Sequence, residues 1–211
     1  MKFPNAHKGV KNIVIGFILE VVAVVLLSIA AILARPGADA ASIATSATFI
    51  LVGSIITIVA FIFELVGLFQ AKKDEGSFST ALWMVLFMFL LAVISAICSF
   101  FPLSYVLAKP ICDVLVDACR LVMMLSIIGG IANMAEKLNE KEYAANGRTI
   151  RMVLAGLFLM GLVLQLLSAL IVNPGALKVM FVLGVVGLVA ELIADICLVI
   201  YLIKAPKKLS K

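Results

Sequence analysis

Long apolar runs alternate with short polar breaks along the whole chain. The runs cover residues of about 13–34, 48–71, 79–101, 111–135, 150–172 and 176–203. Each run is long enough to cross the hydrocarbon core of a bilayer as a helix, which takes about 20 residues. Glycine, proline and asparagine mark the breaks, and no long linker intervenes. The pattern predicts an all-α, polytopic integral membrane protein with one transmembrane domain over residues 1–211, a six-transmembrane-helix bundle.

Composition agrees with this prediction, because 64% of the residues are apolar, 14% are charged and the mean hydropathy is +1.25. An ordinary soluble domain has roughly 25% charged residues. So few polar side chains cannot cover a globule, and the lipid bilayer is the expected surrounding. The net charge of +5 does not indicate a nucleic-acid partner. Most lysines and arginines flank apolar runs, where they set orientation and meet anionic headgroups.

The basic residues also predict an orientation. Thirteen lie in the two tails and in the second and fourth connections, whereas three lie in the remaining connections. By the positive-inside rule both termini are cytoplasmic, and we expect a multi-pass protein of the plasma membrane. Six spans satisfy this bias, whereas omitting the fourth run would place the basic C-terminal tail outside. The first run is long and contains Glu20, so we expect a retained span rather than a signal peptide.

Two charged connections, over residues 71–77 and 136–149, join the second run to the third and the fourth run to the fifth. This arrangement suggests duplicated helical hairpins, although chance similarity between apolar helices explains it equally well. In the longer connection, residues 136–142 are expected to extend the fourth helix into the cytosol. Asn146-Gly147 is expected to end that helix.

Charged side chains inside the predicted spans are the candidate functional residues. A charge at a helix centre costs roughly 2.5–3.5 kcal/mol on insertion scales. At a rise of about 1.5 Å per residue, three of the acids lie about 10–12 Å from the cytoplasmic ends of three different helices. These three are Glu20, Glu64 and Asp195. Glu191 lies one turn deeper than Asp195 on the same helix face.

The fourth span carries the remaining charges on one stripe. Asp113, Asp117 and Arg120 are spaced so that all three share a helix face, and Arg120 can pair with Asp117. Ser54, Thr57 and Glu64 form a second polar stripe in the second span. Across all spans, six acids face one base. Most of the acids therefore have to bind a proton or a cation to be stable in the membrane.

The sequence leads to a functional hypothesis with two alternatives. The first is a carrier, or the membrane subunit of a transporter, that moves a cation, a proton or a basic solute along the acidic stripe. In this hypothesis Asp117, Glu191 and Asp195 bind or exchange the solute, and Arg120 holds the stripe together by pairing with Asp117. At this size a homodimer or a partner transport subunit is expected. The second is a structural or accessory membrane protein whose buried acids only fix helix packing, a reading favoured for Glu20, Glu64 and Asp113 taken singly. The third is a lipid-active enzyme that uses Asp113 and Asp117.

Enzymatic motifs are missing from the sequence. The single histidine, His7, lies in the N-terminal tail, and there is no G-x-S-x-G, P-loop or G-x-G-x-x-G pattern. We therefore expect no catalytic residues, no metal site and no cofactor. In size, number of spans and orientation, the chain resembles in outline the membrane-embedded substrate-binding subunits of vitamin importers. No motif extends that resemblance to particular residues.

Overall fold

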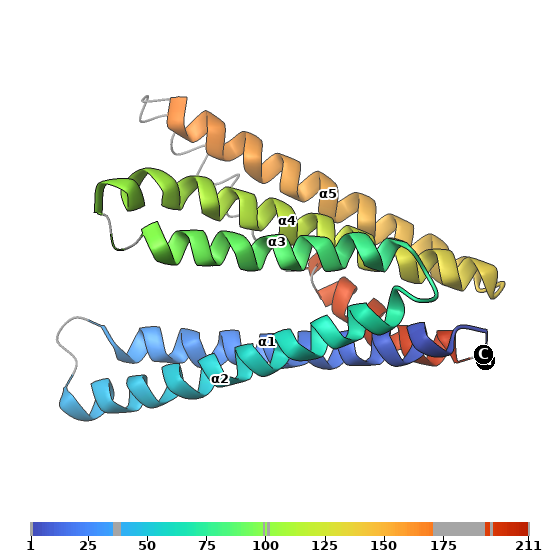
Figure 1. The fold of residues 1–211 in the computed structure, drawn as a ribbon, viewed down its shortest axis with the longest axis horizontal. Helices are drawn as coiled ribbons and strands as arrows, with labels where there is room; N and C mark the ends of the chain where they lie inside the picture. The colour runs from blue at the N-terminus through green and yellow to red at the C-terminus, as the bar shows by residue number, and fades with distance from the viewer. Residues whose placement is uncertain are drawn as a thin grey trace. The chain divides into compact units, whose positions relative to one another are not determined.

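The computed structural model describes residues 2–35, 39–98, 100, 102–170, 193–194 and 196–210. Five long helices follow one another along the chain (Figure 1): α1 (Pro4–Leu33), α2 (Ala40–Ala71), α3 (Ser77–Cys98), α4 (Pro102–Lys137) and α5 (Lys141–Leu170). Residues 196–209 form a sixth helix. The described part of the chain contains no strand, and the all-α prediction is confirmed there.

Four of the described helices are long and apolar enough to cross a bilayer. They are Pro4–Leu33, Ala40–Ala71, Ser77–Cys98 and Val114–Lys137. These segments overlap the first four predicted spans, so the structure is that expected of a membrane protein. The last two predicted spans, 150–172 and 176–203, include residues outside the described ranges. The count of six spans and the cytoplasmic termini therefore stay predictions.

The chain divides into two compact units. We call Phe3–Asp74 the hairpin unit, and Met1–Lys2 together with Glu75–Lys211 the main unit. The boundary falls within the predicted connection 71–77, so α2 and α3 belong to different units, whereas α4 and α5 belong to the same one. Of the two connections that suggested duplicated hairpins, the first therefore joins helices of different units and the second joins helices of the same unit.

In the hairpin unit, α1 and α2 run antiparallel and side by side (Figure 1). Their facing surfaces are lined by small residues at intervals of seven. These are Gly9, Gly16, Ala23 and Ala30 in α1, and Ser46, Gly53, Ala60 and Gly67 in α2, all of them buried. A seven-residue period keeps one face of each helix toward the other as the pair coils to the left. We call these eight residues the small-residue seam.

The seam brings the two backbones into close contact. A Cβ atom added to Gly67 would lie 2.6 Å from the carbonyl oxygen of Gly9 and 2.7 Å from Cγ1 of Ile13. Toward the other end of the pair, the Ser46 hydroxyl donates a hydrogen bond of 2.8 Å to the carbonyl oxygen of Ala30. In lipid, helices associate through such close packing, since lipid chains are as apolar as the side chains themselves.

In the main unit, α3 and α5 each pack against α4 (Figure 1). The largest fully buried side chains that α3 and α4 contribute to this core are Phe78, Val85, Ile127, Ile128, Ile131 and Met134, and Leu202 and Leu209 are buried in the helix over residues 196–209. Phe78 of α3 fits against Gly130 of α4, where an added Cβ would lie 2.7 Å from the ring. The core therefore lies toward the α4 end that leads into α5.

The turn between α4 and α5 differs from the sequence prediction. The predicted extension of the fourth helix through residues 136–142 is wrong, because α4 ends at Lys137 and α5 begins at Lys141. Asn139 adopts a left-handed conformation with φ of 61°, and the Glu140 N–H donates to the Ala135 carbonyl at 2.9 Å. This hydrogen-bond pattern ends helices at a residue that tolerates positive φ. Asn146-Gly147, expected to end the helix, lies inside α5.

The helix over residues 196–209 packs onto the first turns of α5 through stacked tyrosines. The rings of Tyr143 and Tyr201 lie 4.4 Å apart between centroids, and the Tyr143 hydroxyl donates to the Tyr201 carbonyl oxygen at 2.5 Å. Burial raises the pKa of Tyr143, so its phenol stays a neutral donor. Gly147 leaves room for Tyr201, since an added Cβ would lie 2.7 Å from Cζ of that ring. The contact with the Tyr201 ring therefore explains why a glycine stands inside α5.

The small-residue seam predicts that Gly67→Ala destabilises the protein by about 1–3 kcal/mol, because the new methyl group meets backbone that cannot give way. Thermal unfolding in detergent, followed by circular dichroism, measures the effect. The matched control is Gly156→Ala in α5, where nothing lies within 4 Å of an added Cβ. Alanine is the better helix former, so this control should be neutral or slightly stabilising. Equal unfolding temperatures for the two variants would contradict the seam.

Candidate functional site

The predicted site residues are distributed over both units. Glu20 and Glu64 belong to the hairpin unit, and Asp113, Asp117 and Arg120 lie on α4 of the main unit. Glu191 and Asp195 lie outside the described residues, as does the side chain of Asp113. The structure describes the side chains of the other four predicted residues, which are Glu20, Glu64, Asp117 and Arg120.

Glu64 lies in the interface between α1 and α2. It is half-buried, and its Oε1 oxygen is inaccessible to solvent. A Cβ added to Gly16 would lie 2.6 Å from Cγ of Glu64, so the missing side chain of Gly16 makes room for the stem of the glutamate. The small-residue seam thereby holds a carboxylate against the facing helix within the predicted span.

Glu20 follows Gly16 by one helical turn and is also half-buried. Because residues four apart share a helix face, Glu20 lies on the side of α1 that carries the seam. The structure therefore places two of the predicted carboxylates on one hairpin, close to its interface. The sequence adds that neither predicted span of this hairpin, 13–34 or 48–71, contains a lysine or arginine.

The polar stripe predicted along the second span is only partly present. Ser54 and Thr57 are exposed, and the Thr57 hydroxyl donates to the Gly53 carbonyl oxygen of its own helix at 3.0 Å. Such a back-bond satisfies the hydroxyl locally. Glu64 is therefore the member of this stripe that reaches the interface between the helices.

On α4, Asp117 and Arg120 are both exposed. The buried residues on this part of the helix are Cys119 and Met123. Asp117 and Arg120 thus lie on an exposed face of α4, apart from the buried side chains of this part of the helix.

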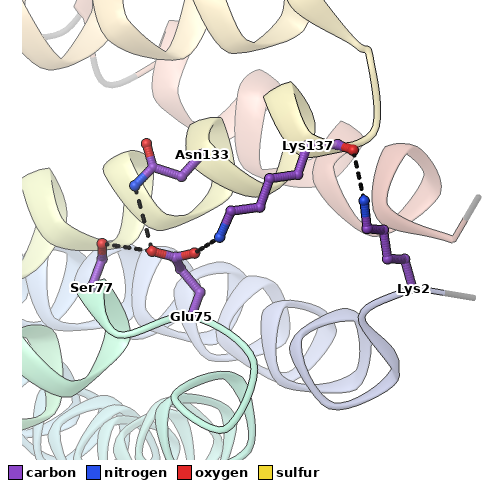
Figure 2. Close-up of polar contacts among 5 residues, drawn as sticks. All are labelled: Lys2, Glu75, Ser77, Asn133 and Lys137. Carbon is purple, nitrogen blue, oxygen red and sulfur yellow. Dashed lines mark hydrogen bonds and ion pairs between the residues drawn. The ribbon is translucent and has the colours of Figure 1, made fainter.

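A polar cluster that the sequence prediction missed lies around Glu75, at the start of the main unit (Figure 2). Lys137 forms an ion pair with Glu75 Oε2 at 2.8 Å, while Ser77 and Asn133 donate to Oε1 at 3.4 and 3.5 Å. The Lys2 ammonium group donates to the Lys137 carbonyl oxygen at 3.2 Å. The cluster joins the connection before α3 to the end of α4.

The side chain of Glu75 is only 12% exposed, whereas that of Lys137 is 53% exposed. Burial raises the pKa of the Glu75 carboxyl, but the hydrogen bonds from Lys137, Asn133 and Ser77 and the charge of Lys137 outweigh it. The net effect is a pKa below the ordinary value of 4.5. Glu75 is therefore a charged, well-bonded structural acid at neutral pH.

Two further ion pairs hold elements of the main unit together. Arg148 on α5 pairs with Glu136 on α4, and Lys208 near the C-terminus pairs with Glu140 in the turn at 2.7 Å. All these acids lie in connections that the sequence marked as cytoplasmic because of their bases. In the sequence, the presence of acids among these bases already indicated that ion pairs form here. The spacing of the residues does not show which acid pairs with which base.

Among the described residues, no three histidine, cysteine, aspartate or glutamate side chains gather into a group that can hold a metal ion. No family model, no curated protein and no solved structure matches the chain. Its chemistry has to be inferred from its own residues.

The lowered pKa of Glu75 predicts a pH-dependent contribution to stability. A carboxyl whose pKa is lower in the folded state stabilises the fold above its ordinary value of 4.5, and the benefit is lost as the pH falls through the lowered value. We expect Glu75→Gln to unfold more easily than the parent protein at pH 7, by about 1 kcal/mol. The difference should shrink below pH 4.5.

Thermal unfolding in detergent at pH 7 and at a series of acid pH values measures this difference. Glu142→Gln is the matched control, because Glu142 is exposed on the first turn of α5 and undergoes the same chemical change. It should leave the unfolding temperature unchanged at neutral pH. A Glu75→Gln defect that is the same at every pH would contradict the role given to the ionised carboxylate.

Proposed function

We propose that this chain is a small membrane carrier, or the membrane subunit of one, that moves a proton, a cation or a basic solute along carboxylates held within its helices. The observation that carries the proposal is the position of Glu64. It is a half-buried carboxylate in the α1–α2 interface, one oxygen of which is inaccessible. It lies in a hairpin whose two predicted spans contain no basic residue.

The chemistry of such a carboxylate supports exchange. A negative charge is expensive in the membrane interior, and the two predicted spans of this hairpin contain no basic residue. Binding a proton or a cation removes that cost, and releasing it restores the charge. A second carboxylate on the same hairpin, Glu20, gives the exchanged ion another position on the seam side of α1. Loading and unloading at these positions is what a coupled carrier requires.

The remaining charged residues extend this proposal. Asp117 on α4, together with Glu191 and Asp195 further along the chain, would add carboxylates to the route, and Arg120 would order them by pairing. Because one chain of this size offers few helices to enclose a route, the proposal includes a second copy or a partner subunit. The expected site is the plasma membrane, with both termini cytoplasmic.

The main alternative is a structural or accessory membrane protein. The packing of the Glu64 stem against Gly16 favours it, since the same contact can serve only to fix the helix pair. In that case replacing the acid would change stability and leave transport unaffected. A lipid-active enzyme is the second alternative, and it would require metal-dependent turnover that is lost in Asp113→Ala and in Asp117→Ala.

We expect Glu64→Gln to lower flux at least about tenfold in proteoliposomes, because an amide cannot exchange a proton or a cation charge. The probes are protons, reported by a pH-sensitive dye inside the vesicles, and sodium, potassium and methylammonium ions as tracers. Glu64→Asp should keep part of the flux, since it retains the carboxylate.

Glu142→Gln, the same change outside the predicted spans, is the control and should transport normally. Folded yield and unfolding temperature are measured for every variant, so that flux is expressed per folded protein. Normal flux in Glu64→Gln, or a lower unfolding temperature with unchanged flux per folded molecule, would reject the carrier and favour the structural alternative.

A further inference from the structure

The helix over residues 196–209, which belongs to the main unit, has two unlike faces. One face is buried and carries Leu198, Tyr201, Leu202, Ala205 and Leu209. On the opposite side, exposed residues follow one another at spacings that keep them on one helix face. These residues are Ile196, Ile200, Ile203, Lys204 and Lys207, and we call them the outer face.

The outer face changes from apolar to cationic at one point along the helix. Its three isoleucines come first, each about half exposed, and Lys204 follows Ile203 directly. The isoleucines lie in the predicted span 176–203, and both lysines lie just beyond it. At the end of an apolar helix in a bilayer, a lysine lays its stem along apolar surface and places its ammonium group among the headgroups. The outer face therefore matches a lipid molecule, with the acyl chain beside the isoleucines and the headgroup beside the lysines.

The charges of these two lysines are available to a ligand. Lys208, the next lysine of the helix, pairs with Glu140 at 2.7 Å. In the part of the chain that the structure describes, neither Lys204 nor Lys207 forms an ion pair with an acid. Both side chains are exposed. The lysines of this helix thus divide into one that holds the fold together and two that present positive charge on the outer face.

The residues of the outer face fit lipid better than they fit another helix. Where this helix contacts protein, small residues make the room, since Ala205 is fully buried and Gly147 of α5 leaves space for the Tyr201 ring. Helices that associate in lipid approach one another through such small residues. The outer face presents branched isoleucines instead, and its two lysines would repel those of a second copy.

We propose that the outer face is a binding surface for anionic phospholipid. Ile196, Ile200 and Ile203 contact the acyl chains, and Lys204 and Lys207 bind the negative headgroup. A phosphatidylcholine molecule offers the same chains, but its choline charge opposes the lysines, so the surface selects phosphatidylglycerol. The inference concerns a lipid contact and does not rest on the proposed carrier function, and loss of flux in Glu64→Gln neither supports nor weakens it.

Quenching of tryptophan fluorescence by brominated lipid tests this surface in the full-length protein reconstituted into vesicles. The single native tryptophan is removed as Trp83→Phe, and Ile203→Trp places a reporter beside Lys204. The vesicles are phosphatidylcholine with a fixed minor fraction of phosphatidylglycerol. In one series the phosphatidylglycerol is brominated, and in the other an equal fraction of the phosphatidylcholine is. The ratio of quenching gives the relative occupancy of the two lipids at the reporter.

We expect phosphatidylglycerol to be enriched at the reporter at least about threefold over phosphatidylcholine, because each lysine near the headgroups attracts an anionic lipid. In Lys204→Gln/Lys207→Gln the ratio should fall to about one. Lys204→Arg/Lys207→Arg should keep the enrichment, since it retains both charges.

The matched control is Lys8→Gln/Lys11→Gln, which removes two exposed lysines from α1 of the hairpin unit and lowers the net charge by the same amount. It should leave the quenching ratio unchanged. The unfolding temperature of every variant is measured, so that quenching is compared between folded proteins.

Equal quenching by the two lipids before any lysine is replaced would overturn the proposal, as would an enrichment that survives the loss of both lysines. A reporter that neither brominated lipid quenches would also overturn it, because protein would then cover the outer face in place of lipid.

Discussion

The close approach of two helix backbones along the small-residue seam is the constraint on which the hairpin unit depends. In lipid, burying apolar side chains against one another gains little, because the solvent they leave is equally apolar. A helix pair is then held by dense van der Waals contact and by hydrogen bonds such as that from Ser46 to Ala30. The seam provides the first of these at every second turn. It also leaves the space at Gly16 that the stem of Glu64 occupies.

The ionisable groups follow two different rules in the two kinds of environment. In the connections, the acids Glu75, Glu136 and Glu140 are each paired with a base, and they join segments of the main unit that are distant in sequence. Within the predicted spans of the hairpin, acids occur without any base on the same two segments. Acids of the first kind are explained by folding alone. A charge of the second kind carries a cost in the membrane, and the proposed function is placed on these acids for that reason.

Much of the secondary structure could be predicted from the sequence, because an apolar run of span length has few alternatives to a helix in lipid. The described helices confirm the helical class, and four of them have the length and hydropathy of spans. The α4–α5 turn could not be predicted in the same way. Residues 136–142 are mostly polar and good helix formers, yet the helix ends there, with Asn139 in a left-handed conformation. Asn146-Gly147 resembles a helix end in the sequence, but Gly147 lies inside α5, where the absence of a side chain leaves space for the Tyr201 ring.

The sequence by itself determined that the chain is helical, suited to lipid, and supplied with more acids than bases inside its apolar runs. It also contained the seven-residue spacing of small residues, although a helix pattern does not say which partner helix a face meets. Tertiary structure decided that α1 pairs with α2, that Glu64 lies in their interface, and that Glu75 and Lys2 both bind Lys137. The physical reason is that hydropathy and helix propensity act over neighbouring residues. Packing and ion pairing instead depend on which distant residues are brought within a few ångströms, and many pairings of apolar helices satisfy the same local pattern.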